Sequence, residues 1–143
     1  MVVLQLPAGA ALIRVSTAVG ERVLEARAES GCTALQLQAL RVARAVPTMT
    51  ELVDRLRVSK SSATSVVDQL VSAELAIREV DAADRRRQRV RPTAAGEELL
   101  NRFDARVRTR VHELTDGLSE SQQKRLLGVL RDIPDPVGLL PLA

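Results

Sequence analysis

The sequence almost lacks aromatic residues: Phe103 is its single Phe, and none of its 143 residues is Tyr or Trp. Proteins that bind single-stranded nucleic acids usually stack the bases on aromatic side chains, so this class is disfavoured. The length predicts one domain that buries roughly two-thirds of its unfolded surface. Its core has to be built from Leu, Val and Ala, as in many helical proteins.

Cysteine and histidine occur once each, as Cys32 and His112. A single cysteine excludes an internal disulfide and fits a reducing, cytoplasmic location. A metal site would have to rest on a cluster of carboxylates, and the sequence shows no such cluster, no Gly-rich phosphate loop and no nucleophile elbow. We therefore expect no catalytic residue, no metal, no cofactor and no enzymatic activity. His112 is interpreted as a surface residue.

Residues 1–15 are apolar enough to suggest a signal peptide. No basic residue precedes their apolar part, and Gln5 and Pro7 interrupt it. We therefore expect neither export nor insertion into a membrane.

The most informative stretch lies at residues 48–93. Thr48 and Glu51 have the spacing of a capping box, which predicts a short helix to about Leu56. After a tight turn, Ser59 is a good N-cap for a second helix. Apolar residues of this helix recur at helical spacing and project onto one arc: Ala63, Val66, Val67, Leu70 and Val71.

The opposite arc of the second helix carries short polar side chains: Ser61, Thr64, Ser65, Asp68, Gln69 and Ser72. Such side chains can reach base edges when a helix enters a DNA groove. A solvated polar face is the alternative, because it is the default for a surface helix.

Two short alternating segments follow, at 76–80 and 88–91, and they predict a pair of half-buried strands. The loop between them, residues 81–87, ends in Arg85, Arg86 and Arg87. A basic hairpin directly after a helix-turn-helix is the plan of a winged helix, whose second helix reads the major groove. A solvated basic loop is the alternative reading of the charge.

This stretch resembles the MarR (multiple antibiotic resistance regulator) family of bacterial transcription factors. Asp84-Arg85-Arg86 matches the Asp-x-Arg of the family's wing, and Thr93-Ala94-Ala95-Gly96 matches the Thr-x-x-Gly that opens its next helix. The resemblance implies a mainly α fold with a small β-hairpin. It implies a single domain over 1–143, with the winged helix-turn-helix at 33–92 and N- and C-terminal dimerisation helices at 1–31 and 93–143.

The flanking helices follow from their own start and stop signals. A first helix is predicted from about 8 to 29, ended by Gly31 and presenting one apolar face: Leu12, Val15, Val19, Val23 and Ala26. Thr33 and Gln36 form a second capping-box pattern, and the helix that they open must stop before Pro47.

The C-terminal part of the chain shows the same signals. Thr93 caps a long helix to about residue 116, and Ser119 and Gln122 open a last helix that ends before Pro134. Its apolar residues are Leu126, Leu127, Leu130 and Ile133. Together with the apolar N-terminus, the apolar tail at 137–142 is interpreted as a dimer interface, and packing within one chain is the alternative.

The resemblance implies a cytoplasmic homodimer that binds duplex DNA at an inverted-repeat operator. We expect a repressor whose repression is relieved by a small-molecule effector. In the family, small molecules act in a crevice that the N-terminal helices help to form. The candidate DNA-binding residues are Ser59, Lys60, Ser61, Ser62, Thr64, Ser65, Gln69, Asp84, Arg85, Arg86 and Arg87.

Two features leave alternatives open. Ser65 and Gln69 stand where the family often has arginine, so a winged-helix dimerisation or protein-docking module without sequence-specific DNA binding is the alternative function. Some members sense oxidants through an N-terminal cysteine, and Cys32 lies just before the N-cap Thr33, which favours a thiolate. Its place between two helices suits a small buried hydrophobe better.

Overall fold

The computed structural model describes residues 7–45 and 47–133. Its elements are α1 (Pro7–Ser30), α2 (Ala34–Ala43), α3 (Met49–Leu56), α4 (Lys60–Ser72), β1 (Ala76–Val80), β2 (Gln88–Pro92), α5 (Ala94–His112), a 3-10 turn (Glu113–Thr115) and α6 (Glu120–Arg131). The predicted fold class, mainly α with a small β-hairpin in a winged helix-turn-helix, is confirmed.

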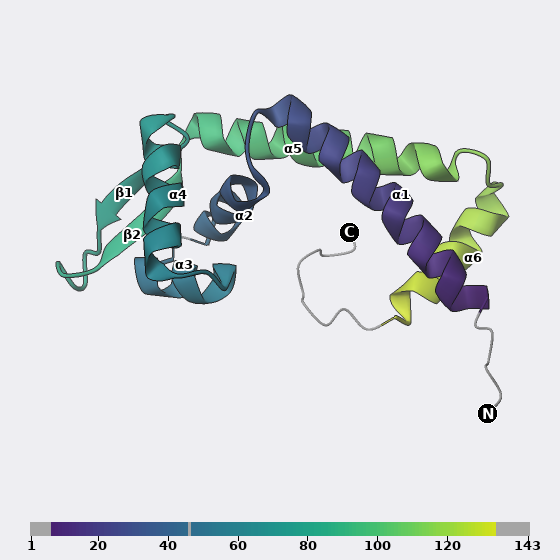
Figure 1. The fold of residues 1–143 in the computed structure, drawn as a ribbon, viewed down its shortest axis with the longest axis horizontal. Helices are drawn as coiled ribbons and strands as arrows, with labels where there is room; N and C mark the ends of the chain where they lie inside the picture. The colour runs from purple at the N-terminus through teal and green to yellow at the C-terminus, as the bar shows by residue number, and fades with distance from the viewer. Residues whose placement is uncertain (1–6, 46, 134–143) are drawn as a thin grey trace.

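The helices and the hairpin divide into a compact lobe and an extended arm (Figure 1). Helices α2, α3 and α4 and the hairpin gather at one end of the molecule, which we call the winged-helix lobe. The long helices α1 and α5 lead away from it and pack against each other, and α6 follows at the far end.

The helices start where the sequence places their caps. Capping boxes form at Thr33, Thr48 and Ser119, and Ser59 and Thr93 also accept hydrogen bonds from backbone N–H groups of the first turn. These bonds satisfy donors that a helix start leaves without partners. All five predicted helix starts are therefore confirmed.

The hydrophobic core lies within the winged-helix lobe and the start of α5. Its largest fully buried side chains are Leu40, Leu52, Val67, Leu70, Val90 and Leu100. They come from α2, α3, α4, β2 and α5, so the lobe packs its elements around one centre.

The Thr-x-x-Gly motif joins the hairpin to α5. The backbone N–H of Thr93 donates to the carbonyl oxygen of Leu75 at 3.0 Å, and its hydroxyl donates to that of Glu74 at 2.6 Å. A Cβ on Gly96 would lie 2.0 Å from the same Leu75 oxygen. Glycine is therefore required at this position, because α5 begins directly against the turn before β1.

The hairpin is antiparallel and runs in register from Ala76 opposite Pro92 to Val80 opposite Gln88. The second strand is one residue longer than predicted, because Pro92 belongs to it. A proline is tolerated there since it ends an edge strand, where its missing N–H breaks no inner ladder.

Several apolar residues are exposed in the single chain. Val71 lies at the edge of the apolar arc of α4 and is exposed. On α1 only Ala26 is buried, and α6 has no buried residue. The expected apolar tail at 137–142 lies outside the described residues.

Candidate nucleic-acid interface

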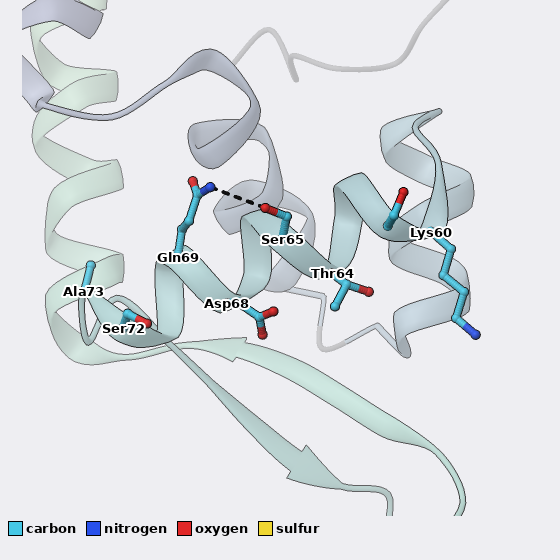
Figure 2. Close-up of a pocket in the computed structure, with 8 residues that line it drawn as sticks. Lys60, Thr64, Ser65, Asp68, Gln69, Ser72 and Ala73 are labelled. Atoms are coloured by element: carbon cyan, nitrogen blue, oxygen red, sulfur yellow. Dashed lines mark hydrogen bonds between the residues drawn. The ribbon is translucent and has the colours of Figure 1, made fainter.

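The polar face of α4 borders an open groove of about 1100 Å³. The side chains that line it come from successive turns of this one helix and its C-cap (Figure 2): Lys60, Ser61, Thr64, Ser65, Asp68, Gln69, Ser72 and Ala73. They recur at intervals of three and four residues, as one face of a helix does. This face is opposite the buried residues Ala63, Val66, Val67 and Leu70.

The start of α4 is held by serine hydroxyl groups. The Ser59 Oγ accepts from the backbone N–H of Ser62 at 3.1 Å, and it lies within hydrogen-bond distance of the hydroxyls of Ser61 and Ser62. The first N–H groups of a helix carry a partial positive charge that favours anions. Lys60 adds a full positive charge to the same end.

Gln69 lies within a short chain of hydrogen bonds. Its Oε1 accepts from Nε2 of Gln36 at 3.0 Å, and its own Nε2 donates to the Ser65 hydroxyl at 3.4 Å. Gln36 belongs to the capping box of α2, so the start of α2 touches the polar face of α4. No sequence pattern predicts this contact, because 33 positions separate the two glutamines.

Asp68 places a carboxylate on the same face. Its Oδ1 forms an ion pair at 2.6 Å with the guanidinium of Arg78, which lies on β1. The arginine offsets a charge that would repel a polyanion, and the pair also ties α4 to the hairpin. Asp68 belongs to the predicted polar arc but is not among the candidate DNA-binding residues. The sequence does not point to Arg78 either, because only the fold brings β1 beside α4.

The tip of the hairpin carries Arg85, Arg86 and Arg87, all exposed. The Asp84 carboxylate accepts from the backbone N–H of Arg86 at 3.0 Å, and it forms an ion pair at 3.6 Å with the Arg87 guanidinium. Asp84 therefore stabilises the turn through the backbone amide of Arg86.

The base of the hairpin is held by a second aspartate. The Asp81 side chain is only 7% exposed and accepts from Nε of Arg89 at 2.8 Å and from the backbone N–H of Ala83, also at 2.8 Å. The N–H of Ala83 and the Arg89 guanidinium hold the pKa of Asp81 below its usual range. Arg89 also pairs across a β-bridge with Thr48, the N-cap of α3.

The candidate residues thus form two groups on neighbouring elements. One group lies along α4, and its members are Ser59, Lys60, Ser61, Ser62, Thr64, Ser65 and Gln69. The other group, Asp84 to Arg87, lies at the tip of the hairpin that packs beside α4 (Figure 1). The hydroxyls of Ser59 and Ser62 face each other within the cap rather than the groove.

Cys32 and His112 take the positions that suit structural residues. Cys32 is buried, and burial raises the pKa of its thiol, which is opposite to what a reactive thiolate needs. His112 is exposed on α5, with its Nε2 at 3.6 Å from Asp116. Among the residues that the structure describes, no group of His, Cys, Asp or Glu side chains is arranged to hold a metal ion. None of the helices in the described part is long and apolar enough to cross a membrane.

Residues 30–87, which include α2, α3, α4 and the Asp-x-Arg of the hairpin, match the model of the MarR family. No curated protein sequence shows significant similarity to the chain.

Solved structures show the same fold. Wild-type MarR from E. coli in its apo form is 25% identical, with a TM-score of 0.73, and the match covers 88% of this chain and 95% of that one. CouR, a transcriptional repressor bound to a 23-mer DNA duplex, is 28% identical, with a TM-score of 0.64 and coverage of 86% and 89%. A mutant of MepR from S. aureus, bound to an oligodeoxyribonucleotide, is 20% identical, with a TM-score of 0.73 and coverage of 87% and 93%.

Proposed function

We propose that the chain, which matches the MarR family model over residues 30–87, is a homodimeric, sequence-specific repressor of transcription. Helix α4 enters the major groove of duplex DNA, and the hairpin reaches the adjacent minor groove. The proposal rests on one observation: a groove lined by short polar side chains runs along α4, and the hairpin that carries Arg85, Arg86 and Arg87 packs beside this helix. The DNA-bound structures of CouR and MepR support it.

The chemistry of the two groups assigns them different roles. Hydroxyl and amide groups on α4 can donate to and accept from base edges, and this is how sequence is read directly. Guanidinium groups at an exposed hairpin tip suit phosphates and the negative potential of a narrow minor groove. We therefore assign base reading to Thr64, Ser65 and Gln69, and backbone or minor-groove contacts to the arginines.

Dimerisation is supported by apolar surface that the single chain leaves in water. Ile13 on α1 is 70% exposed, and Val129 on α6 is 63% exposed, together with several neighbours: Leu12, Val15, Leu24, Leu126, Leu127, Leu130 and Ile133. Large exposed apolar side chains on two helices suit an interface, and a two-fold dimer covers the same surface on both copies. Residues 1–31 and 93–143 are accordingly proposed as the dimerisation helices around the winged helix-turn-helix at 33–92.

Relief by a small-molecule effector is supported by a second cavity, of about 360 Å³. It is lined by the end of α1, by α5 and by the turn after α5: Glu29, Ala105, Arg106, Thr109, Arg110 and Glu113. Arg106 and Arg110 both form ion pairs with Glu29. A polar or charged ligand that separates these pairs would shift α1 against α5 and with it the spacing of the two α4 helices.

Sequence selection from random duplex DNA tests the proposal. We expect the selected site to be an inverted repeat, with half-sites about one helical turn, roughly 10 bp, apart. Binding to this site should weaken steeply with salt, because arginines displace counterions from phosphates. If no sequence is enriched and binding is equal on all duplexes, the docking module without sequence-specific contacts becomes the better reading.

A further inference from the structure

Gln36 links the start of α2 to the DNA-facing side of α4. Its Oε1 accepts from the backbone N–H of Thr33 at 2.8 Å, which completes the capping box of α2. A side-chain amide has one oxygen and one nitrogen, so the Nε2 group of Gln36 is left to donate. It donates to Oε1 of Gln69 at 3.0 Å.

These bonds set the orientation of the Gln69 amide. Its oxygen accepts from Nε2 of Gln36. Its nitrogen points along α4 towards Ser65, as Figure 2 shows. The Ser65 hydroxyl can either donate or accept, so it would tolerate both orientations of the amide. Gln36 would not, because a rotated Gln69 would turn its NH₂ group against the NH₂ group of Gln36. The backbone N–H of Thr33 can only donate, so it determines the orientation of the Gln36 amide. The Gln36 amide in turn determines the orientation of the Gln69 amide.

We propose that Gln36 is a specificity-determining residue, which makes Gln69 read a base as a hydrogen-bond donor. The inference rests on the proposed function, since it concerns bases in the major groove. A free glutamine amide pairs with adenine through its oxygen and its nitrogen together. With its oxygen held by Gln36, Gln69 presents an N–H, which matches the acceptors O6 and N7 of guanine or O4 of thymine. Gln36 acts through Gln69 and is a positioning residue.

The test reverses the polarity of this contact and keeps the helix cap. In Gln36→Glu one carboxylate oxygen still accepts from Thr33, since glutamate is also a usual residue at this capping-box position. The second oxygen can only accept, so the Gln69 amide has to turn its nitrogen towards it and its oxygen towards the groove. The melting temperature should stay close to that of the wild type.

Sequence selection from random duplex DNA then reports the orientation of the amide. We first identify the base position whose preference Gln69→Ala alters. At this position Gln36→Glu should shift the preference from guanine or thymine to adenine or cytosine, whose amino groups donate, by about fivefold, the low end for a good base contact. The added negative charge lowers affinity for all sequences alike, so the relative preference is the quantity to compare.

A matched control lies at the other end of the molecule. Gln122 has the same position in the capping box of α6, where its Oε1 accepts from the N–H of Ser119 at 2.8 Å. Gln122→Glu makes the same chemical change away from α4 and should leave every base preference as it is. In a Gln69→Ala background, Gln36→Glu should likewise have no effect on the preference.

Three results decide the matter. A shift at the position that Gln69→Ala defines supports the proposal. An unchanged preference there in Gln36→Glu overturns it, and so does a Gln69→Ala protein that keeps the wild-type preference at every position. A wild-type protein that selects no sequence at all is a separate failure, because it overturns the proposed function itself.

Discussion

The winged-helix lobe contrasts with α1 and α6 of the extended arm, which we call the outer arm. The two regions differ in how much of their apolar surface is covered within one chain. In the lobe, Leu40, Leu52 and Leu70 are fully buried. In the arm, α6 has no buried residue, and its Leu127 is 42% exposed. Apolar surface is driven out of water. We infer that the lobe is complete within one chain, whereas the arm needs a second surface.

The long helices also differ from the lobe in what holds them together. Where α1 crosses α5, Glu25 and Glu29 form ion pairs with Arg106 and Arg110. Exposed ion pairs contribute little to stability, typically about 0–1 kcal/mol each. These ion pairs therefore add little to the stability of the contact between α1 and α5, and separating them costs little free energy.

The two regions should differ most in how the free energy of unfolding responds to one added methyl group. Gly96→Ala puts a Cβ 2.0 Å from the backbone oxygen of Leu75, and we expect a loss of about 3 kcal/mol or more in the free energy of unfolding. Gly128→Ala on α6 meets no atom within 4 Å and should raise the free energy of unfolding by about 0.5–1 kcal/mol, because alanine favours a helix. Urea unfolding of both variants measures the difference. Equal effects would contradict the division into two regions.

A charge on the exposed face of α6 should separate the subunits and leave the lobe folded. For Leu127→Asp we expect the dissociation constant of the dimer to rise at least about tenfold, because burial of a leucine side chain contributes about 1.5–3 kcal/mol. Ser121→Asp, on the same helix, is the control and should change little. Sedimentation equilibrium gives both constants. If Leu127→Asp dimerises as well as the wild type, α6 does not form the interface.

The arginines of the hairpin should carry the salt dependence of DNA binding. Arg85→Ala should weaken binding to all duplexes alike and lower the slope of log K against log salt by about one unit, the expected effect of one lost phosphate contact. Arg125→Ala on α6 removes the same charge from the arm and should leave the slope unchanged. Fluorescence anisotropy at several salt concentrations measures it. An equal change in both variants would mean that net charge alone drives binding.

Arg86 should show a different dependence from its neighbours. A guanidinium in the minor groove gains most where A·T-rich steps narrow the groove. Arg86→Ala should therefore lose affinity, by about 1 kcal/mol, chiefly for operators with A·T-rich flanks. Comparing one operator with A·T-rich and G·C-rich flanks tests this, with Arg85→Ala as the control. A loss that is independent of the flanks would place Arg86 on phosphates.

The smallest effect concerns the base of the hairpin and appears only with pH. The pKa of Asp81 is lowered in the folded protein, by the Ala83 N–H and the Arg89 guanidinium. The charged Asp81 carboxylate therefore stabilises the fold fully above the pKa of aspartate in the unfolded chain, about 3.9. This stabilisation is lost as the pH falls through the lower pKa of Asp81 in the folded protein. Asp81→Asn should melt below the wild type near pH 7, and the gap should close in acid. A gap that widens in acid would show that this carboxylate does not stabilise the hairpin in its charged form.

Local signals predicted the helices and their starts because the chemistry of a cap involves residues only three positions apart. Thr33 with Gln36, Thr48 with Glu51 and Ser119 with Gln122 each form the expected reciprocal hydrogen bonds. The basic tip of the hairpin and the polar face of α4 followed from spacing in the same way. The exposure of Val71 does not follow from spacing, since periodicity defines an arc but not the width of the surface that covers it.

The sequence by itself determined where each helix begins, which face of α4 is polar, and that a basic turn follows it. Only the tertiary structure decided which side chains meet across these elements. Gln36 reaches Gln69, Arg78 reaches Asp68, and Arg89 reaches Asp81, because the packing of the core sets the distances between helices and strands. Asp84 accepts from the backbone N–H of Arg86 because the path of the loop places that N–H within reach. Spacing along the chain specifies local hydrogen bonds, whereas contacts between distant residues depend on how the buried faces fit together.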